Sequence, residues 1–189
     1  VYFCSGQSNM EMAVNAMENA TKEIADSVHY PNLRYFALKG MTGTFDNPNT
    51  FVRSKSGNYN WMVSKPNMFI KPTDKNVFQF PSATCYFFAR DLYKSLGGDV
   101  PIGFVSSTWS NMPIQVFSSP DALADATCGG TKEANSIVVK ASTQLKASQY
   151  ERDQRMTEMM PSQVWFGSIW PLAKMRFSGV LWYQGESNV

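Results

Sequence analysis

Ser8 stands where a chain can hold a nucleophile. It lies in the segment Gly6-Gln7-Ser8-Asn9-Met10, which follows a short apolar run from Val1 to Cys4 and precedes a helix-like segment. A serine at a strand-to-helix turn is held exposed above the sheet edge, with its own N–H directed at a substrate oxyanion. Ser8 is therefore the candidate nucleophile for acyl transfer, a reaction that also needs a base and donors for the oxyanion.

Two further polar turns follow apolar runs of the sequence. Residues 108–113 follow the run 101–107, and residues 184–188 follow the run 177–183. In parallel α/β sheets, ligands bind beyond the carboxyl ends of the strands, where such turns converge. An oxyanion hole is expected there with three donors: the Ser8 N–H, an N–H from the Ser110-Asn111 turn, and the side-chain amide of Asn188.

Each of these residues also has a purely structural interpretation. Serine at position 8 is a residue type that caps helices, and Asn188 is a residue type that hydrogen-bonds within turns. Glu186 is either a general base or a side chain that holds its own loop through backbone N–H groups. Three polar turns at three predicted strand ends favour the catalytic interpretation of Ser8, Ser110 and Asn188.

The order of the predicted elements indicates an α/β fold. Strands are predicted over residues 1–4, 33–38, 101–107 and 177–183. Helices are predicted over residues 11–28, 83–96 and 132–160, and another helix begins at Ser119-Pro120. Alternation of this kind predicts a parallel sheet with helices on both faces.

Two details of this pattern are specific enough to be checked. Ser82 is the expected N-cap of the helix over 83–96, and Gly97-Gly98 is its expected stop. Residues 41–79 are rich in Gly, Asn, Ser, Thr and Pro, so they are expected to form a long loop region.

The composition excludes several classes of function. The 189 residues carry 17 Lys and Arg against 15 Asp and Glu, a net charge of +2 with His neutral. That charge is too small to indicate nucleic acid or a membrane surface, and no apolar stretch reaches the length of a membrane span. Cys4 and Cys85 are expected to be buried, and Cys128 lies in a loop where it can bridge to a partner. No cysteine stands near histidine at ligand spacing, so a zinc site is not expected. The sequence also implies no cofactor.

Two motifs carry a resemblance to a known family. Gly6-Gln7-Ser8-Asn9-Met10 and Gln184-Gly185-Glu186-Ser187-Asn188 resemble the first and third sequence blocks of the sialate O-acetylesterase family of the SGNH hydrolase superfamily. Pro31-Asn32-Leu33-Arg34 is similar to the start of that family's second strand. Residues 87–96, followed by Pro101-Ile102-Gly103, are similar to its passage from helix to third strand.

The resemblance implies a three-layer α/β/α domain with a parallel, flavodoxin-like sheet over residues 1–189, which removes O-acetyl groups from sugars by a serine mechanism. Ser8 matches the family's nucleophile, and Asn188 matches its oxyanion-hole asparagine. The family's second block reads Trp-Gly-Gly-Thr-Pro, whereas this chain has Trp109-Ser110-Asn111-Met112-Pro113. Ser110 thus takes the place of the glycine whose N–H completes the hole, and its β-carbon is tolerated only if the backbone angles allow it.

The resemblance places the catalytic base in a downstream Asp-x-x-His motif that these 189 residues do not contain. The domain is therefore expected to be truncated at both ends, with a second chain or a missing C-terminal segment supplying that motif. The chain does spell Asp26-Ser27-Val28-His29, and His29 is its one histidine. A helix of about 18 residues runs about 27 Å at 1.5 Å per residue, which carries His29 away from Ser8 and argues against it as the base.

The expected substrate is an O-acetylated carbohydrate, with sialic acids first and acetylated xylan as the alternative among esterases. The acyl-end motifs cannot separate these two, so the loop over 41–79 is the candidate for sugar recognition. A non-catalytic carbohydrate-binding protein is the second class, supported by the Ser110-Asn111 substitution and the missing base. A nucleotide-binding flavodoxin-like protein is discounted because Gly6-Gln7-Ser8 lacks spaced glycines. The resemblance favours a secreted or lysosomal glycoprotein, which agrees with the sequon Asn19-Ala20-Thr21.

Overall fold

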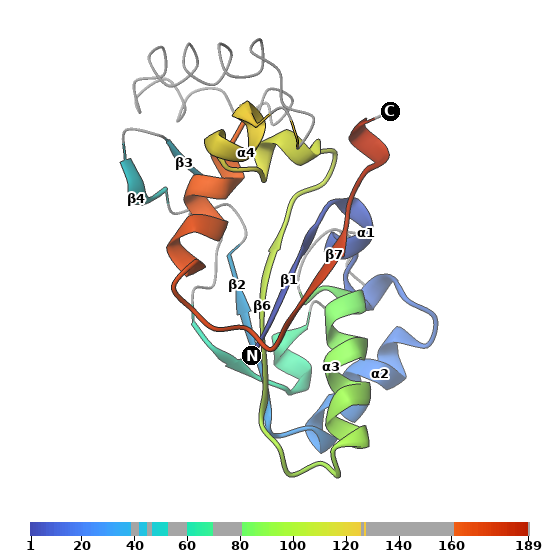
Figure 1. Ribbon diagram of the computed structural model, residues 1–189. Helices are drawn as coiled ribbons and strands as arrows, with labels where there is room; N and C mark the ends of the chain where they lie inside the picture. Colours follow the sequence, from blue (N-terminus) through green and yellow to red (C-terminus); the bar gives the residue numbers. More distant parts are fainter. Residues whose placement is uncertain are drawn as a thin grey trace. The chain divides into compact units, whose positions relative to one another are not determined.

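A five-stranded sheet forms the frame of the candidate site (Figure 1). This computed structural model describes residues 1–38, 42–44, 47–52, 60–69, 81–125, 127 and 161–188. The strands are β1 (Tyr2–Gly6), β2 (Leu33–Ala37), β5 (Met62–Val63), β6 (Ile102–Thr108) and β7 (Gly179–Tyr183). Their order across the sheet is β5-β2-β6-β1-β7.

The sheet is mixed rather than wholly parallel, which corrects the sequence-based prediction. β1 pairs in parallel with β6 and with β7, and β2 pairs in parallel with β6. The short strand β5 runs antiparallel to β2, with Val63 opposite Arg34. β6 lies between β1 and β2, whereas a flavodoxin sheet has its first strand between the second and third. β6 is buried along almost its whole length, as expected for a strand covered on both faces.

The chain after Ser8 forms four short helical segments, so the prediction of one helix over 11–28 is wrong. They are α1 (Ser8–Glu11), η1 (Val14–Ala16), α2 (Ala20–Asp26) and η2 (Ser27–His29). Two local features interrupt the helix. Ala13 is extended and forms a β-bridge with Ser82, and Asn19 adopts the left-handed conformation at φ 57°.

The helix α3 (Ala83–Ser95) confirms the predicted start and stop signals. The Ser82 Oγ accepts a hydrogen bond from the Cys85 N–H at 3.3 Å. Gly97 and Gly98 follow the helix at φ 81° and 82°, in the left-handed region that glycine adopts without steric cost.

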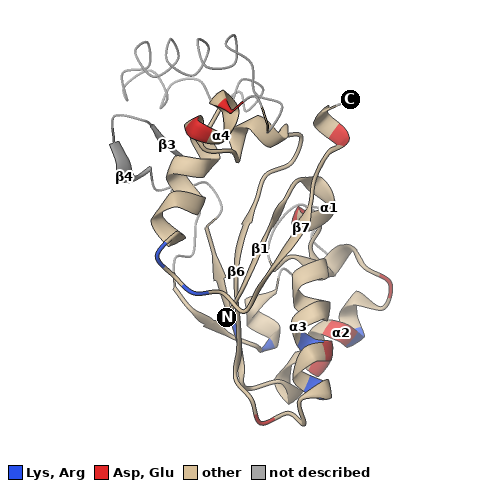
Figure 2. Ribbon diagram, in the orientation of Figure 1, with Lys and Arg blue, Asp and Glu red and all other residues tan. Residues whose placement is uncertain are grey.

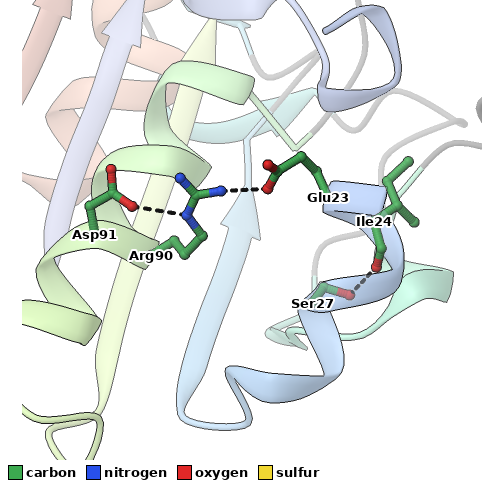
Figure 3. A network of polar contacts seen from close by, with 5 residues as sticks. All are labelled: Glu23, Ile24, Ser27, Arg90 and Asp91. Carbon is green, nitrogen blue, oxygen red and sulfur yellow. Dashed lines mark hydrogen bonds and ion pairs between the residues drawn. The ribbon is translucent and has the colours of Figure 1, made fainter. Parts of the chain in front are cut away.

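A polar network joins α2 to α3 (Figure 3). Arg90 donates a hydrogen bond to Glu23 of α2, and its Nε donates to Asp91 Oδ1 at 2.9 Å. Burial alone would lower the pKa of Arg90, but the hydrogen bond to Asp91 and the charges of Asp91 and Glu23 outweigh it and raise that pKa. The hydroxyl of Ser27, the first residue of η2, donates to the carbonyl of Ile24 in the last turn of α2 at 2.6 Å.

The core of the sheet unit is aromatic. Tyr35 and Phe104, on neighbouring strands, have ring centroids 4.6 Å apart, and Phe69 stacks edge-on to Tyr86 of α3 at 4.9 Å. Cys4 and Cys85 lie fully buried in this cluster as free thiols, as predicted. Contact with the Cys85 thiol, together with burial, raises the pKa of Cys4, so it stays a protonated, apolar side chain.

The chain divides into two compact units. The first consists of Val1–Lys39, Lys55–Asn111 and Arg176–Glu186, and the second of Gly40–Ser54, Met112–Met175 and Ser187–Val189. Among the described residues, the first unit also contains η3 (Pro66–Met68). The turn η8 (Glu186–Asn188) begins at the last residue of the first unit.

The second unit contains a small antiparallel ladder of β3 (Thr42–Thr44) and β4 (Asn47–Val52). Its helical segments are η4 (Ile114–Val116), α4 (Pro120–Ala124), η6 (Trp165–Ile169) and η7 (Trp170–Leu172). Ser119 caps α4 by accepting from the Ala122 N–H at 3.1 Å, as its sequence predicts. The strands β3, β4 and β5 and the turn η3 lie within the predicted loop region over 41–79, so that region contains short ordered elements. The predicted helix over 132–160 and Cys128 lie outside the described residues.

Charged residues gather on the helices rather than on the middle of the sheet (Figure 2). The strands β1, β6 and β7 contain none, while α2 and α3 carry both signs. None of the helices in the described part of the chain has the length and apolar composition that a bilayer crossing needs. Among the same residues, no three His, Cys, Asp or Glu side chains gather as metal ligands would.

The cap of α3 is a direct test of the fold. We expect Ser82→Ala to lower the free energy of unfolding by about 1 kcal/mol, because the Cys85 N–H loses its acceptor. Ser95→Ala, at the exposed end of the same helix, is the control and should change stability by less than about 0.5 kcal/mol. Urea unfolding measures both variants, and equal effects would argue against the cap.

Candidate active site

Gly6, at the end of β1, lies between the ends of the two strands that flank β1. Its φ of 140° suits glycine, and a β-carbon built there would lie 2.0 Å from the Tyr183 carbonyl oxygen. In the sheet register, Gly6 lies opposite Thr108 of β6 and Tyr183 of β7. The Trp109 N–H donates to the Gly6 carbonyl at 2.9 Å. The predicted convergence of the ends of these strands at one sheet edge is therefore confirmed.

Ser8 begins α1 at this edge. The residue before it, Gln7, is the N-cap of that helix, and no side chain caps the helix. The structure therefore does not use Ser8 as a helix cap. No hydrogen bond among the described residues uses the Ser8 hydroxyl or its N–H, although its carbonyl accepts from the Met12 N–H at 3.0 Å. Ser8 is half-buried, and its two donor groups remain available to a ligand.

The first and third sequence motifs hold each other in place. The Gln7 N–H donates to the Tyr183 carbonyl at 3.1 Å, and the buried Gln7 Oε1 accepts from the Gly185 N–H at 3.2 Å. The Asn9 Nδ2 donates to Glu186 Oε1 at 2.7 Å. Of the two interpretations of Glu186, the structure supports the one in which it holds the loop, although its partner is a side chain rather than backbone.

Ser110 is bound to a carboxylate. Its N–H donates to Glu11 Oε2 at 2.7 Å, and its hydroxyl donates to the same oxygen at 2.5 Å. Glu11 is the last residue of α1 and is only 5% exposed. The N–H that the resemblance assigns to the oxyanion hole is therefore engaged in this structure. The next residue of the turn, Asn111, is exposed and left-handed at φ 60°, and no hydrogen bond among the described residues uses its N–H.

Asn188 belongs to the second unit and is held there by two neighbours. Its Oδ1 accepts from the Ile114 N–H at 2.9 Å, and its Nδ2 donates to Gln115 Oε1 at 2.9 Å. These contacts agree with the turn-holding interpretation of Asn188. The role of Asn188 as an oxyanion donor stays a prediction.

His29 lies at the amino ends of the parallel strands, whereas Ser8 lies at their carboxyl ends. It ends η2, four residues before Leu33, where β2 begins. β2 and β1 are both parallel to β6, so the start of β2 and the end of β1 lie at opposite sheet edges. Ser8 follows the end of β1. This topology, rather than the single long helix expected from the sequence, separates His29 from Ser8.

Three residues of the site had no predicted role: Gln7, Asn9 and Glu11. Their side chains bind Gly185, Glu186 and Ser110, respectively. One feature of the sequence indicates a role for Glu11. It is an acidic residue directly after the motif and beside apolar residues, and a carboxylate buried there needs hydrogen-bond donors. Its partner, 99 positions away, could not be read from spacing.

The sheet and the helices around it define an α/β protein, and a solved structure shares this fold. A crystal structure of a carbohydrate acetylesterase from Xanthomonas citri superimposes with a TM-score of 0.63 at 24% identity, covering 99% of this chain and 32% of that one. This similarity supports the α/β fold. No protein-family model matches the chain.

Curated proteins are similar to the whole of this chain. Over its full length the chain is 31% identical to the sialate O-acetylesterases of Homo sapiens and Mus musculus, across 193 and 202 residues. The chain is thus homologous to the sialate O-acetylesterase family, which confirms the resemblance carried by its two motifs. It spans about a third of the length of these relatives, 31% and 35% respectively.

The close approach at Gly6 predicts a large loss of stability on substitution. We expect Gly6→Ala to lower the free energy of unfolding by about 3 kcal/mol or more, because the new methyl group overlaps the Tyr183 carbonyl. Gly97→Ala is the matched control, since Gly97 also has a positive φ but nothing within 4 Å of the added carbon. That variant should lose about 1–2 kcal/mol. Similar losses in urea unfolding of the two variants would contradict the steric argument.

Proposed function

We propose that residues 1–189 form part of the catalytic domain of a serine carbohydrate O-acetylesterase, with Ser8 as the nucleophile. One observation supports this most directly. Ser8 follows the carboxyl end of β1, and its hydroxyl and N–H are unused among the described residues, while its neighbours Gln7 and Asn9 are both engaged. The homology with sialate O-acetylesterases supports the same reaction.

In this proposal the reaction has two halves. The Ser8 Oγ attacks the acetyl carbonyl carbon while its proton passes to a base, and the carbonyl oxygen becomes an oxyanion. The intermediate collapses to an acetyl-serine, and the sugar oxygen leaves with the proton from the base. Water then attacks the acetyl-serine by the reverse arrangement and releases acetate, which restores the Ser8 hydroxyl.

Donors at the strand ends would stabilise the oxyanion. The Ser8 N–H is the first, and the Asn188 side chain is the proposed second. The Ser110 N–H can join them only if its bond to Glu11 opens, whereas the neighbouring Asn111 N–H can act without that change. The proposed third donor is therefore an N–H of the Ser110-Asn111 turn. Each such donor is worth about 2.7–4 kcal/mol of transition-state stabilisation.

The base in this proposal comes from outside residues 1–189. The chain has one histidine, and His29 lies at the edge of the sheet opposite Ser8. The relatives are about three times as long as this chain, so they have room for a further histidine. A downstream segment of the same protein, or a second chain derived from it, would supply an Asp-x-x-His motif.

The substrate proposed first is an O-acetylated sialic acid, because the relatives bear that activity in their names. Acetylated xylan is the alternative within the same chemistry. Competition between the two acetylated sugars in an acetate-release assay would decide which binds. A secreted or lysosomal glycoprotein stays a prediction, and a loss of mass on treatment with peptide N-glycosidase would test it at Asn19, which is exposed.

A non-catalytic carbohydrate-binding protein is the second candidate. The engagement of the Ser110 N–H by Glu11 favours it, because that N–H is directed at a carboxylate of the protein itself. A binding protein of this kind would not be modified at Ser8 by a reagent that requires an activated serine.

Ser8 can be tested directly in the full-length protein. We expect a fluorophosphonate probe to label the wild type at Ser8, and Ser8→Ala to reduce acetate release by at least about a thousandfold. Ser95→Ala, on the exposed end of α3, should be labelled like the wild type. Normal acetate release by Ser8→Ala would exclude Ser8 as the nucleophile, and a wild type that resists labelling would favour the non-catalytic candidate.

Asn188 needs a control that separates its structural bonds from catalysis. We expect Asn188→Ala to lower kcat about a hundredfold, the usual cost of one oxyanion donor. Gln115→Ala removes the structural partner of Asn188 and should change kcat by less than about threefold if that contact only holds the turn. Steady-state kinetics at saturating acetylated substrate compares them, and equal losses would assign Asn188 a structural role.

A further inference from the structure

We propose that Glu11 is a positioning residue of the active site, which holds the turn Trp109–Asn111 against the helix of the nucleophile. This inference rests on the proposed function. Glu11 ends α1, the four-residue helix that Ser8 begins. Its carboxylate accepts two hydrogen bonds from Ser110, one from the N–H and one from the hydroxyl.

The burial of Glu11 makes these bonds strong constraints. Its side chain belongs to a residue only 5% exposed, and a buried carboxylate is costly unless hydrogen bonds satisfy it. Both donors of Ser110 meet the same oxygen, at 2.7 and 2.5 Å. Hydrogen bonds to a charged group are about twice as strong as neutral ones. The turn after β6 is therefore tied to α1 at a defined point.

This tie sets the distance between the nucleophile and the proposed oxyanion donors. Ser8 and Glu11 are three residues apart in one helical turn, so the position of Glu11 relative to Ser8 is fixed by the helix. Ser110 is then held to Glu11, and Asn111 follows Ser110 directly in the chain. Small displacements of groups around a reacting centre cost about a hundredfold in rate.

The serine at position 110 contributes to this arrangement. A glycine or alanine there would offer the carboxylate only its N–H, whereas serine offers a hydroxyl as well. The substitution in the family's Trp-Gly-Gly pattern thus adds a second donor to a buried carboxylate. We infer that Glu11 and Ser110 act as a pair.

The experiment uses graded variants of the full-length protein. Glu11→Gln keeps the size and one acceptor atom but loses the charge, and Glu11→Met loses every strong acceptor. Glu18→Gln makes the same chemical change at an exposed position in the turn before α2. The measurements are the rate of fluorophosphonate labelling at Ser8, kcat and KM for an acetylated sugar, and hydrogen exchange of the segment around Ser110.

The expected result is a loss in rate without a loss of binding or folding. The labelling rate and kcat should fall by about tenfold for Glu11→Gln and about a hundredfold for Glu11→Met, with KM changed less than about threefold. Glu18→Gln should match the wild type. Ser110→Ala should slow labelling when it is made alone. Added to Glu11→Met, it should slow labelling much less, because the two changes break the same contact.

Two outcomes would overturn the inference. The first is that Glu11→Gln and Glu11→Met are both labelled at Ser8 as fast as the wild type. The other is unchanged hydrogen exchange around Ser110 in Glu11→Met, which would mean that the carboxylate does not hold the turn. A wild type that resists labelling contradicts the proposed function, and the catalytic part of the inference falls with it. Exchange around Ser110 then shows separately whether Glu11 holds the turn.

Discussion

The site depends on how closely the end of β1 approaches β7. A β-carbon at position 6 would lie 2.0 Å from the Tyr183 carbonyl oxygen, so only glycine allows this approach. This close approach lets Gly6 pair with Tyr183 at the end of both strands. Because β1 also pairs with β6 on its other side, the turns after Gly6, Thr108 and Tyr183 start from one line across the sheet.

Three polar residues around Ser8 each hold a different segment of these turns. Gln7 binds the backbone of Gly185, Asn9 binds Glu186, and Glu11 binds Ser110. Each of these side chains fixes a neighbouring segment, so Ser8, the proposed nucleophile, is placed without a hydrogen bond to its own hydroxyl among the described residues. A group that must attack a substrate gains from this arrangement, because its environment is organised before the substrate binds.

The sequence predicted several local elements of the fold, whereas the roles of Ser8, Ser110 and Asn188 stay predictions. The cap at Ser82, the stop at Gly97 and the strands β2, β6 and β7 were predicted within two residues, because they depend on local residue types. The helix over 11–28 was predicted wrongly, since Ala13 forms a bridge with a distant residue, Ser82, that periodicity does not register. The antiparallel β5 was missed because two residues carry almost no pattern.

The sequence by itself determined the two motifs, their placement after apolar strands and the family to which they are related. These are properties of short segments and of residue types. The tertiary structure alone decided that Glu11 binds Ser110 and that His29 stands at the edge opposite Ser8. Those two results depend on strand order and register, which bring together or separate residues far apart in the chain, and no local preference encodes them.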